Sequence, residues 1–162
     1  MDAFPLVVEQ VLAAWNSQNN QLNTLLNNLS DEHLSRHIAP GKNSGTYILG
    51  HITAISDALL PLLGYGNRLF SDYDHIFVHT PESSGPAQPS VHAIRQAFEA
   101  VNSNLTEHIW KTSISDWLQA HNSITPEAFA SEPHRNKLNV IINRTNHLAY
   151  HLGQLVLLKS PV

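Results

Sequence analysis

Three pairs of histidines, each pair spaced four residues apart, stand out among the residues that could do chemistry. They are His33/His37, His75/His79 and His147/His151. Histidine is the commonest metal ligand in proteins and titrates near neutral pH. The chain holds 11 histidines in 162 residues, and random placement would give about 0.7 such pairs (roughly 11 × 11/162). The spacing is therefore weak evidence by itself, and the surrounding sequence must choose among the pairs.

The third pair lies beside an apolar stripe of helical period. Leu148, Leu152 and Leu155 recur at helical spacing, and His147 and His151 each precede one of the first two leucines,. Both imidazoles are therefore expected on the flank of a buried helix face. The other two pairs precede a Pro-Gly loop or lie in a connection rich in Asp and Tyr, where we expect exposed side chains.

A third candidate ligand, His51, falls inside the apolar stripe of another predicted helix. It follows Ile48 by three residues and precedes Ile55 by four, so its ring should point toward the core. With His147 and His151 it would offer three imidazole nitrogens. Three-histidine sites with one open coordination position are typical of catalytic metal centres. Ligation by nitrogen alone suits Zn, Ni, Cu or Fe.

Four amphipathic helices are expected to position these side chains. The hydrophobic periodicity predicts helices at roughly 4–29, 44–64, 90–111 and 136–159. Together they predict an all-α, four-helix-bundle domain that takes in the whole chain, residues 1–162,. The connections at roughly 65–89 and 112–135 are long for a bundle.

The two long connections carry few signals of their own. The run DHIFVHT is the only β-like stretch, and it would have no partner strand. In the second connection, SISDWLQAH is expected to form a short helix capped by Ser115,. Trp110 and Trp117 are expected to pack this connection against the bundle.

Helix direction decides whether the three histidines can meet. Each residue adds about 1.5 Å, so His51 lies about 10 Å from the start of its helix. His151 and His147 lie about 12 and about 18 Å from the end of theirs. The rings reach similar heights only if the two helices run antiparallel, which requires an up-down-down-up order with 65–89 as the crossover. His108 then falls about 27 Å down the third helix, away from the others.

Composition argues against several classes of protein. Cysteine is absent, which excludes disulfides, thiolate catalysis and cysteine-ligated zinc. The net charge is −4 and the nine Lys and Arg residues are scattered, so nucleic-acid binding is not expected. No apolar run reaches the ~18 residues of a membrane span, and MDAFPLVVEQ does not read as a signal peptide. We therefore expect a cytoplasmic protein.

Two segments resemble a known family. SGTYILGHITAISDALLPLLG (44–64) is similar to the second helix of the DinB/YfiT-like family, and RTNHLAYHLGQLVLLK (144–159) is similar to the fourth. The family signature, one His in the second helix and HxxxH in the fourth, falls on His51, His147 and His151. The resemblance implies a divalent metal, with Ni or Zn as first choices, inside a four-helix bundle. It also implies a homodimer.

The resemblance leaves two activities open. Relatives include low-molecular-weight-thiol S-transferases and metal-dependent hydrolases, so the partner would be a small-molecule substrate, with a thiol cosubstrate in the transferase case. Asp57 and Glu99 lie off the apolar stripes and are expected in solvent, which leaves no predicted general base. Two alternatives stay open. The metal could be structural in a non-catalytic binding bundle, for which neither Gln154 nor His108 is an obvious fourth ligand, or the histidines could bond to one another without metal.

Overall fold

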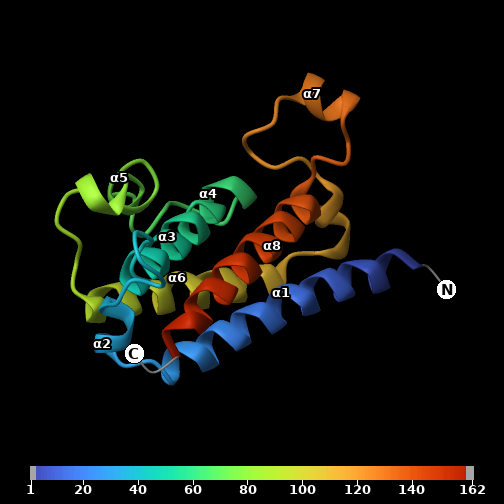
Figure 1. Cartoon of the computed structure of the whole chain (residues 1–162). Coiled ribbons are helices and arrows are strands. Elements are labelled where there is room, and N and C mark those ends of the chain that lie inside the picture. The colour runs from blue at the N-terminus through green and yellow to red at the C-terminus, as the bar shows by residue number, and fades with distance from the viewer. Residues whose placement is uncertain (1–2, 160–162) are drawn as a thin grey trace.

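Four long helical segments make up the bundle. The structure, a computed structural model, describes residues 3–159, which contain no strand. The long segments are α1 (Ala3–Asn27), α3 (Gly45–Asp57) continued by α4 (Leu59–Leu63), α6 (Val91–Lys111) and α8 (Lys137–Leu155) (Figure 1). The short elements are α2 (Asp31–Ser35), α5 (Tyr73–Phe77), α7 (Pro126–Ser131) and the 3-10 turns η1 (Glu82–Ser84), η2 (Ile114–Leu118) and η3 (Val156–Lys159). The all-α helical fold is confirmed.

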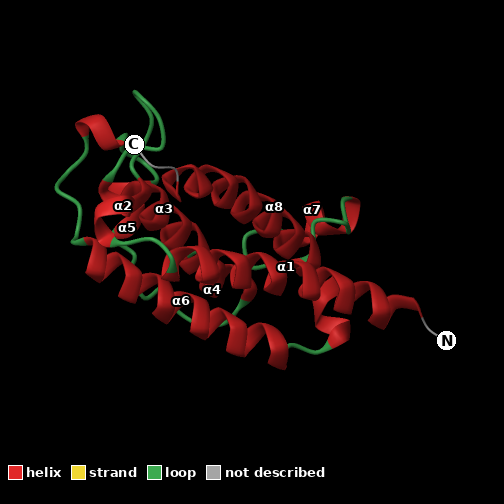
Figure 2. Cartoon of the chain, turned by 60° about the horizontal axis from the view of Figure 1, so that its bottom comes forward, coloured by secondary structure: helices red, strands yellow, loops and turns green. Residues whose placement is uncertain are grey.

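Contacts at the helix ends show how the helices run. Arg36, which precedes α3, donates to the carbonyl of Leu158 after α8 (2.5 Å), so α3 and α8 are antiparallel. Tyr65 after α4 bonds Thr112 after α6 through their hydroxyls (2.7 Å), so α3–α4 and α6 run the same way. Figures 1 and 2 show α1 beside α8 with the same direction. These directions follow the up-down-down-up order, with the crossover between α4 and α6.

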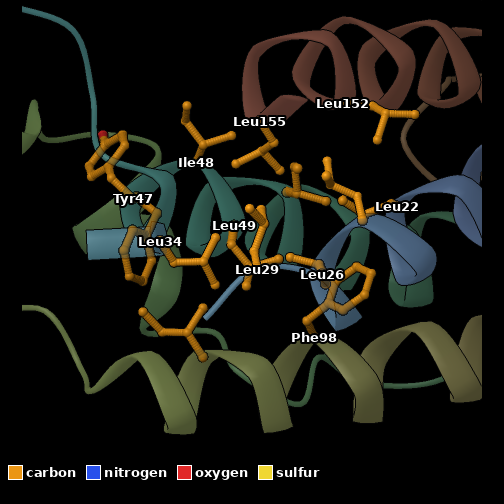
Figure 3. Close-up of a cluster of buried hydrophobic side chains, with 14 of the residues drawn as sticks. Leu22, Leu26, Leu29, Leu34, Tyr47, Ile48, Leu49, Phe98, Leu152 and Leu155 are labelled. Carbon is orange, nitrogen blue, oxygen red and sulfur yellow. The ribbon is translucent and has the colours of Figure 1, made fainter. Parts of the chain in front are cut away.

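The apolar stripes of the long helices form two buried clusters, and the larger one contains residues of all four long segments. Leucines and aromatic residues of α1, α3, α6 and α8 converge there, and Leu34 of α2 closes one end (Figure 3). Fully or almost fully buried members include Leu22, Leu34, Leu49, Phe98 and Leu155. Burial of such side chains contributes roughly 1.5–3 kcal/mol each, so the core holds α3 and α8 in fixed register.

The second predicted helix is broken near its end. It is helical from Gly45, but α3 stops at Asp57 and α4 starts at Leu59. Pro61 explains the break, because it has no N–H and its ring clashes with the carbonyl four residues earlier, at Asp57. Gly64 then ends α4 in the left-handed conformation (φ 84°), which glycine adopts without strain,.

The same helical stretch is apolar enough to resemble a membrane span. Gly45–Leu63 has a mean hydropathy of 1.3, and it is the one such stretch among residues 3–159. However, 67% of it is buried inside the bundle. That burial is the pattern of a core helix.

Asp57 contradicts the expectation of a solvated carboxylate, because it is fully buried. Its oxygens accept from the backbone N–H groups of Leu69 (2.8 Å) and Phe70 (3.0 Å) and from Arg68 Nε (3.2 Å). Arg68 also pairs with Asp74. The carboxylate thus ties the start of the crossover to the end of α3. Glu99, by contrast, is exposed as expected.

The crossover is helical where the sequence looked β-like. DHIFVHT contributes most of α5, and Tyr73 and Phe77 of that helix pack edge to face at a centroid distance of 5.1 Å. A lone strand would leave its backbone groups unpaired, whereas a helical turn satisfies them locally.

The second connection also differs in detail. Ser113, not Ser115, caps η2, and its Oγ accepts from Asp116 N (3.3 Å). Trp117 is buried as expected. Trp110 is 54% exposed, so it does not pack the connection against the bundle as expected. A bridge between Ala120 and Asn136 closes the neck of the segment that carries α7.

Candidate metal centre

Side chains from α3 and α8 bring three imidazoles together. His51 Nε2 lies 3.1 Å from His147 Nε2, and His151 Nε2 lies 3.2 Å from the same atom. One ring nitrogen of each of the three histidines lies within 4.8 Å of the others. Among residues 3–159 this is the one group of three or more His, Cys, Asp or Glu side chains with metal-site geometry. The three residues singled out in the sequence are therefore those that meet.

The helices fix the positions of these rings. His147 and His151 are one turn apart on α8, with ring centroids 4.5 Å apart, as the i,i+4 spacing dictates. His51 comes from the antiparallel helix and lies edge to face with His151 at 5.0 Å. All three histidines are partly buried.

Two of the three histidines have their other nitrogen anchored. His51 Nδ1 lies 2.8 Å from the carbonyl oxygen of Phe77, and His151 Nδ1 lies 2.7 Å from Gln154 Oε1. Both oxygens accept only, so each Nδ1 must carry the proton and each Nε2 keeps its lone pair. Histidines that bind metals usually donate their second N–H in this way. Gln154 is therefore a support for His151, not a fourth ligand.

This proton count disfavours a cluster held together by histidine hydrogen bonds alone. With Nε2 of His51 and His151 unprotonated, only a proton on His147 Nε2 could serve the two short contacts. That proton can point to only one of the two neighbours. In the other contact, two nitrogen lone pairs would face each other at about hydrogen-bond distance. A cation between the nitrogens removes that repulsion. Metal–nitrogen bonds of 2.0–2.1 Å place tetrahedral ligand atoms about 3.3 Å apart and octahedral neighbours about 2.9 Å apart, and the two observed distances fall between these values.

The environment favours the neutral forms of His147 and His151. Burial, reinforced by His151, His51 and Arg144, lowers the pKa of His147 to about 4. Burial also lowers the pKa of His151, against the opposing effect of its bond to Gln154. Metals bind the unprotonated imidazole, so His147 and His151 are in the binding form at neutral pH.

A cavity of about 390 Å³ opens beside the cluster and is lined by His51 and His151. Its walls are apolar at Ile48 and Phe77, and Lys42 is the one charged side chain among its lining residues. No Asp or Glu belongs to that lining. The site therefore has space for a small molecule next to the nitrogen cluster, without a carboxylate to act as a base.

The other histidines do not join the site. His75 and His79 are exposed. His33 is partly buried, and its Nδ1 accepts from Ser30 N (3.2 Å) in the cap of α2. His108 stacks on Tyr65 at the far end of the bundle (centroids 5.1 Å apart), as the height argument predicts.

Three contributors to the site were missed by the sequence reasoning. The Phe77 carbonyl is a backbone group, which no side-chain pattern reveals. Lys42 lies in a loop without periodicity. Tyr150, 65% exposed, lines the cavity and contacts the His151 ring edge to face (5.1 Å). Its place one residue before His151 was the only available signal.

Comparison with known proteins agrees with the geometry. The family model of the DinB superfamily matches residues 14–155, which include all three histidines. No curated protein matches the chain. Because the match spans most of the sequence, the chain belongs to the DinB superfamily.

Proposed function

We propose that the chain is a metal-dependent enzyme that acts on a small molecule, as a thiol S-transferase or a hydrolase. One observation carries the proposal. Three Nε2 atoms converge beside an open cavity, and two of the rings are oriented through their Nδ1 protons. Zn and Ni are the proposed ions, since both accept neutral imidazole ligands.

The roles follow from the positions. His51, His147 and His151 would hold the ion, and Phe77 and Gln154 orient two of the rings. When bound, the ion supplies Lewis acidity toward a water molecule or a thiol. The apolar side chains of the cavity wall offer a surface for the apolar part of a substrate.

The cavity lining favours a thiol reactant. No carboxylate lines it, so a nucleophile that ionises with little help has the advantage. A thiol has a pKa of about 8.5, far below that of water. The Lys42 ammonium at the cavity favours the anionic form of such a reactant, or an anionic group elsewhere on the substrate.

An ion with a purely structural role is the competing function. Structural zinc sites are closed by four protein ligands, whereas the described residues bring three histidines together and Gln154 is already engaged by His151. This difference supports the catalytic proposal. Homodimeric assembly and a cytoplasmic location belong to the same proposal and rest on the family resemblance and the composition.

Metal analysis with a matched control tests the proposal. Purified protein should contain Zn or Ni by elemental analysis, and His147→Ala should lose most of it. His79→Ala removes an exposed histidine of another i,i+4 pair and should retain the metal. Equal metal loss in both variants would show that the wrong pair was chosen.

Activity separates catalysis from a structural ion. The metal-loaded protein should turn over a thiol-transfer substrate or an ester-hydrolysis substrate. Chelation and His147→Ala should each abolish the turnover, and added metal should restore it to the chelated wild type. Turnover that survives both treatments would refute the enzymatic role of the ion.

A further inference from the structure

The chain segment from the last residue of α5 to Glu82 lies alongside the first two turns of α3 and is hydrogen-bonded to their residues and the N-cap at three positions. The bonds are His51 Nδ1 to Phe77 O (2.8 Å), Tyr47 hydroxyl to Thr80 O (2.6 Å), Ser44 N to Glu82 Oε2 (2.7 Å) and Ser44 Oγ to Glu82 Oε1 (2.5 Å). From one bond to the next, the residue number rises along the segment (77, 80, 82) and falls along α3 (51, 47, 44). Residues 77–82 therefore run antiparallel to the helix, with a bond at each successive turn.

At the metal end, the segment is locked by close packing. The Phe77 ring is fully buried against Gly50, the residue before His51. A Cβ placed on Gly50 would lie 2.4 Å from that ring, which real structures do not tolerate. Tyr47 packs edge to face on the same ring (centroids 5.6 Å apart). The backbone carbonyl of Phe77 thus has little freedom to leave His51.

At the other end, a carboxylate fastens the segment to the start of α3. Glu82 accepts from both the backbone and the hydroxyl of Ser44, the N-cap of that helix, and Gln88 Nε2 donates to it (3.0 Å). A negative charge at a helix N-terminus is favoured by the helix dipole. Hydrogen bonds to a charged acceptor are also stronger than neutral ones.

We propose that residues 77–82 form a clasp that holds His51 in the tautomer with Nε2 free, so that Tyr47 and Glu82 help set metal affinity without touching the ion. The inference rests on the proposed metal function. Both are positioning residues, since each acts through the Phe77 carbonyl. His151 takes its support from Gln154 on its own helix, so loosening the clasp affects His51 selectively.

A matched pair of Tyr→Phe variants tests the clasp. Tyr47→Phe removes the hydroxyl that bonds Thr80, whereas Tyr65→Phe removes a hydroxyl bonded to Thr112 at the other end of the bundle. Zinc affinity is measured by competition with a chromophoric chelator. Tyr47→Phe should weaken it by about tenfold, the lower end of the effect of outer-shell changes. Tyr65→Phe should leave it unchanged.

Nitrogen-15 NMR of the metal-free protein supplies a second readout that stability alone does not move. In the wild type, His51 should show a protonated Nδ1 and a free Nε2. In Tyr47→Phe and Glu82→Gln, it should show a mixture of tautomers, while His151 keeps its wild-type pattern. Gly50→Ala, if it folds, should give the largest change, because the added methyl group displaces Phe77.

The outcomes separate the two proposals. Equal zinc affinity in Tyr47→Phe and Tyr65→Phe, with an unaltered His51 tautomer, overturns the clasp and leaves the metal site intact. Wild-type protein that binds neither zinc nor nickel overturns the metal site, and the tautomer measurement then decides the clasp by itself. A shared loss of affinity in both Tyr→Phe variants would show general destabilisation and would also overturn the clasp.

Discussion

Metal-free protein should lose stability as the pH falls from 6.5 toward 4, with His147 as a main cause. Burial and neighbouring groups lower the pKa of this histidine from its ordinary 6.5 to about 4 in the folded chain. Between these two values the unfolded chain binds a proton at His147 that the folded chain rejects. The free energy of unfolding therefore decreases as the pH falls through this window. Above pH 6.5 the group contributes no slope.

The magnitude follows from the same two values. A change from 6.5 to about 4, at 1.36 kcal/mol for each pH unit, sets an upper limit of about 3 kcal/mol. The ring is only partly buried, and solvent screens part of the effect. We expect about 1.5–2 kcal/mol. Below about pH 4 the folded chain takes up the proton too, and the loss levels off.

Urea unfolding followed by circular dichroism measures this slope. Wild type, His147→Gln and the control His79→Gln are compared without metal at several pH values between 7 and 4. Because His51 and His151 lie against His147, the difference between wild type and His147→Gln reports on the histidine cluster, and His79→Gln controls for an exposed histidine outside it. His147→Gln should flatten the pH dependence, and His79→Gln should not. Parallel curves for wild type and His147→Gln, within about 0.5 kcal/mol, would refute the assigned environment of His147.

Two further substitutions test the buried carboxylate at the end of α3 and the lysine at the cavity. Asp57→Ala removes the fully buried carboxylate that holds Arg68 and two backbone N–H groups, and should lower the free energy of unfolding by about 3–5 kcal/mol. Urea titration measures this, and a loss below about 1 kcal/mol would contradict the role. Lys42→Gln should raise KM for an anionic substrate about fivefold, as expected for about 1 kcal/mol of attraction, with little change in kcat. Steady-state kinetics with a neutral analogue provide the control, since an equal rise for both substrates argues against an electrostatic role.

The parts of the fold that follow from periodic burial were predictable. Apolar spacing identified the long helices, and two of the predicted ranges, 44–64 and 90–111, start at the serines that cap them. Ser44 Oγ accepts from Tyr47 N (3.1 Å) and Ser90 Oγ from Ala93 N (3.2 Å). His51 was identified because a polar residue interrupts an apolar stripe, and such an interruption can be seen in the sequence alone.

The remainder depends on partners that spacing does not specify. Asp57 looked like a surface carboxylate because its partners lie in a loop eleven to thirteen residues away. The orientation of His51 depends on a backbone carbonyl of the crossover. Hydrogen bonds of this kind join residues that come together only when the chain folds. A helical stripe, in contrast, depends on the spacing of apolar residues along the sequence.

The narrow neck at Ala120 and Asn136 has a practical consequence for work on this protein. Lys137 N also donates to Gln119 O at this neck (3.1 Å). Residues 121–135 therefore form a loop whose two ends are hydrogen-bonded to each other. In Figure 1 this loop projects from the bundle, and its helix α7 has no buried residue. Such a site tolerates insertions with a small cost in loop entropy. A fluorophore, an affinity tag or an immobilising linker introduced there would leave the imidazole cluster undisturbed.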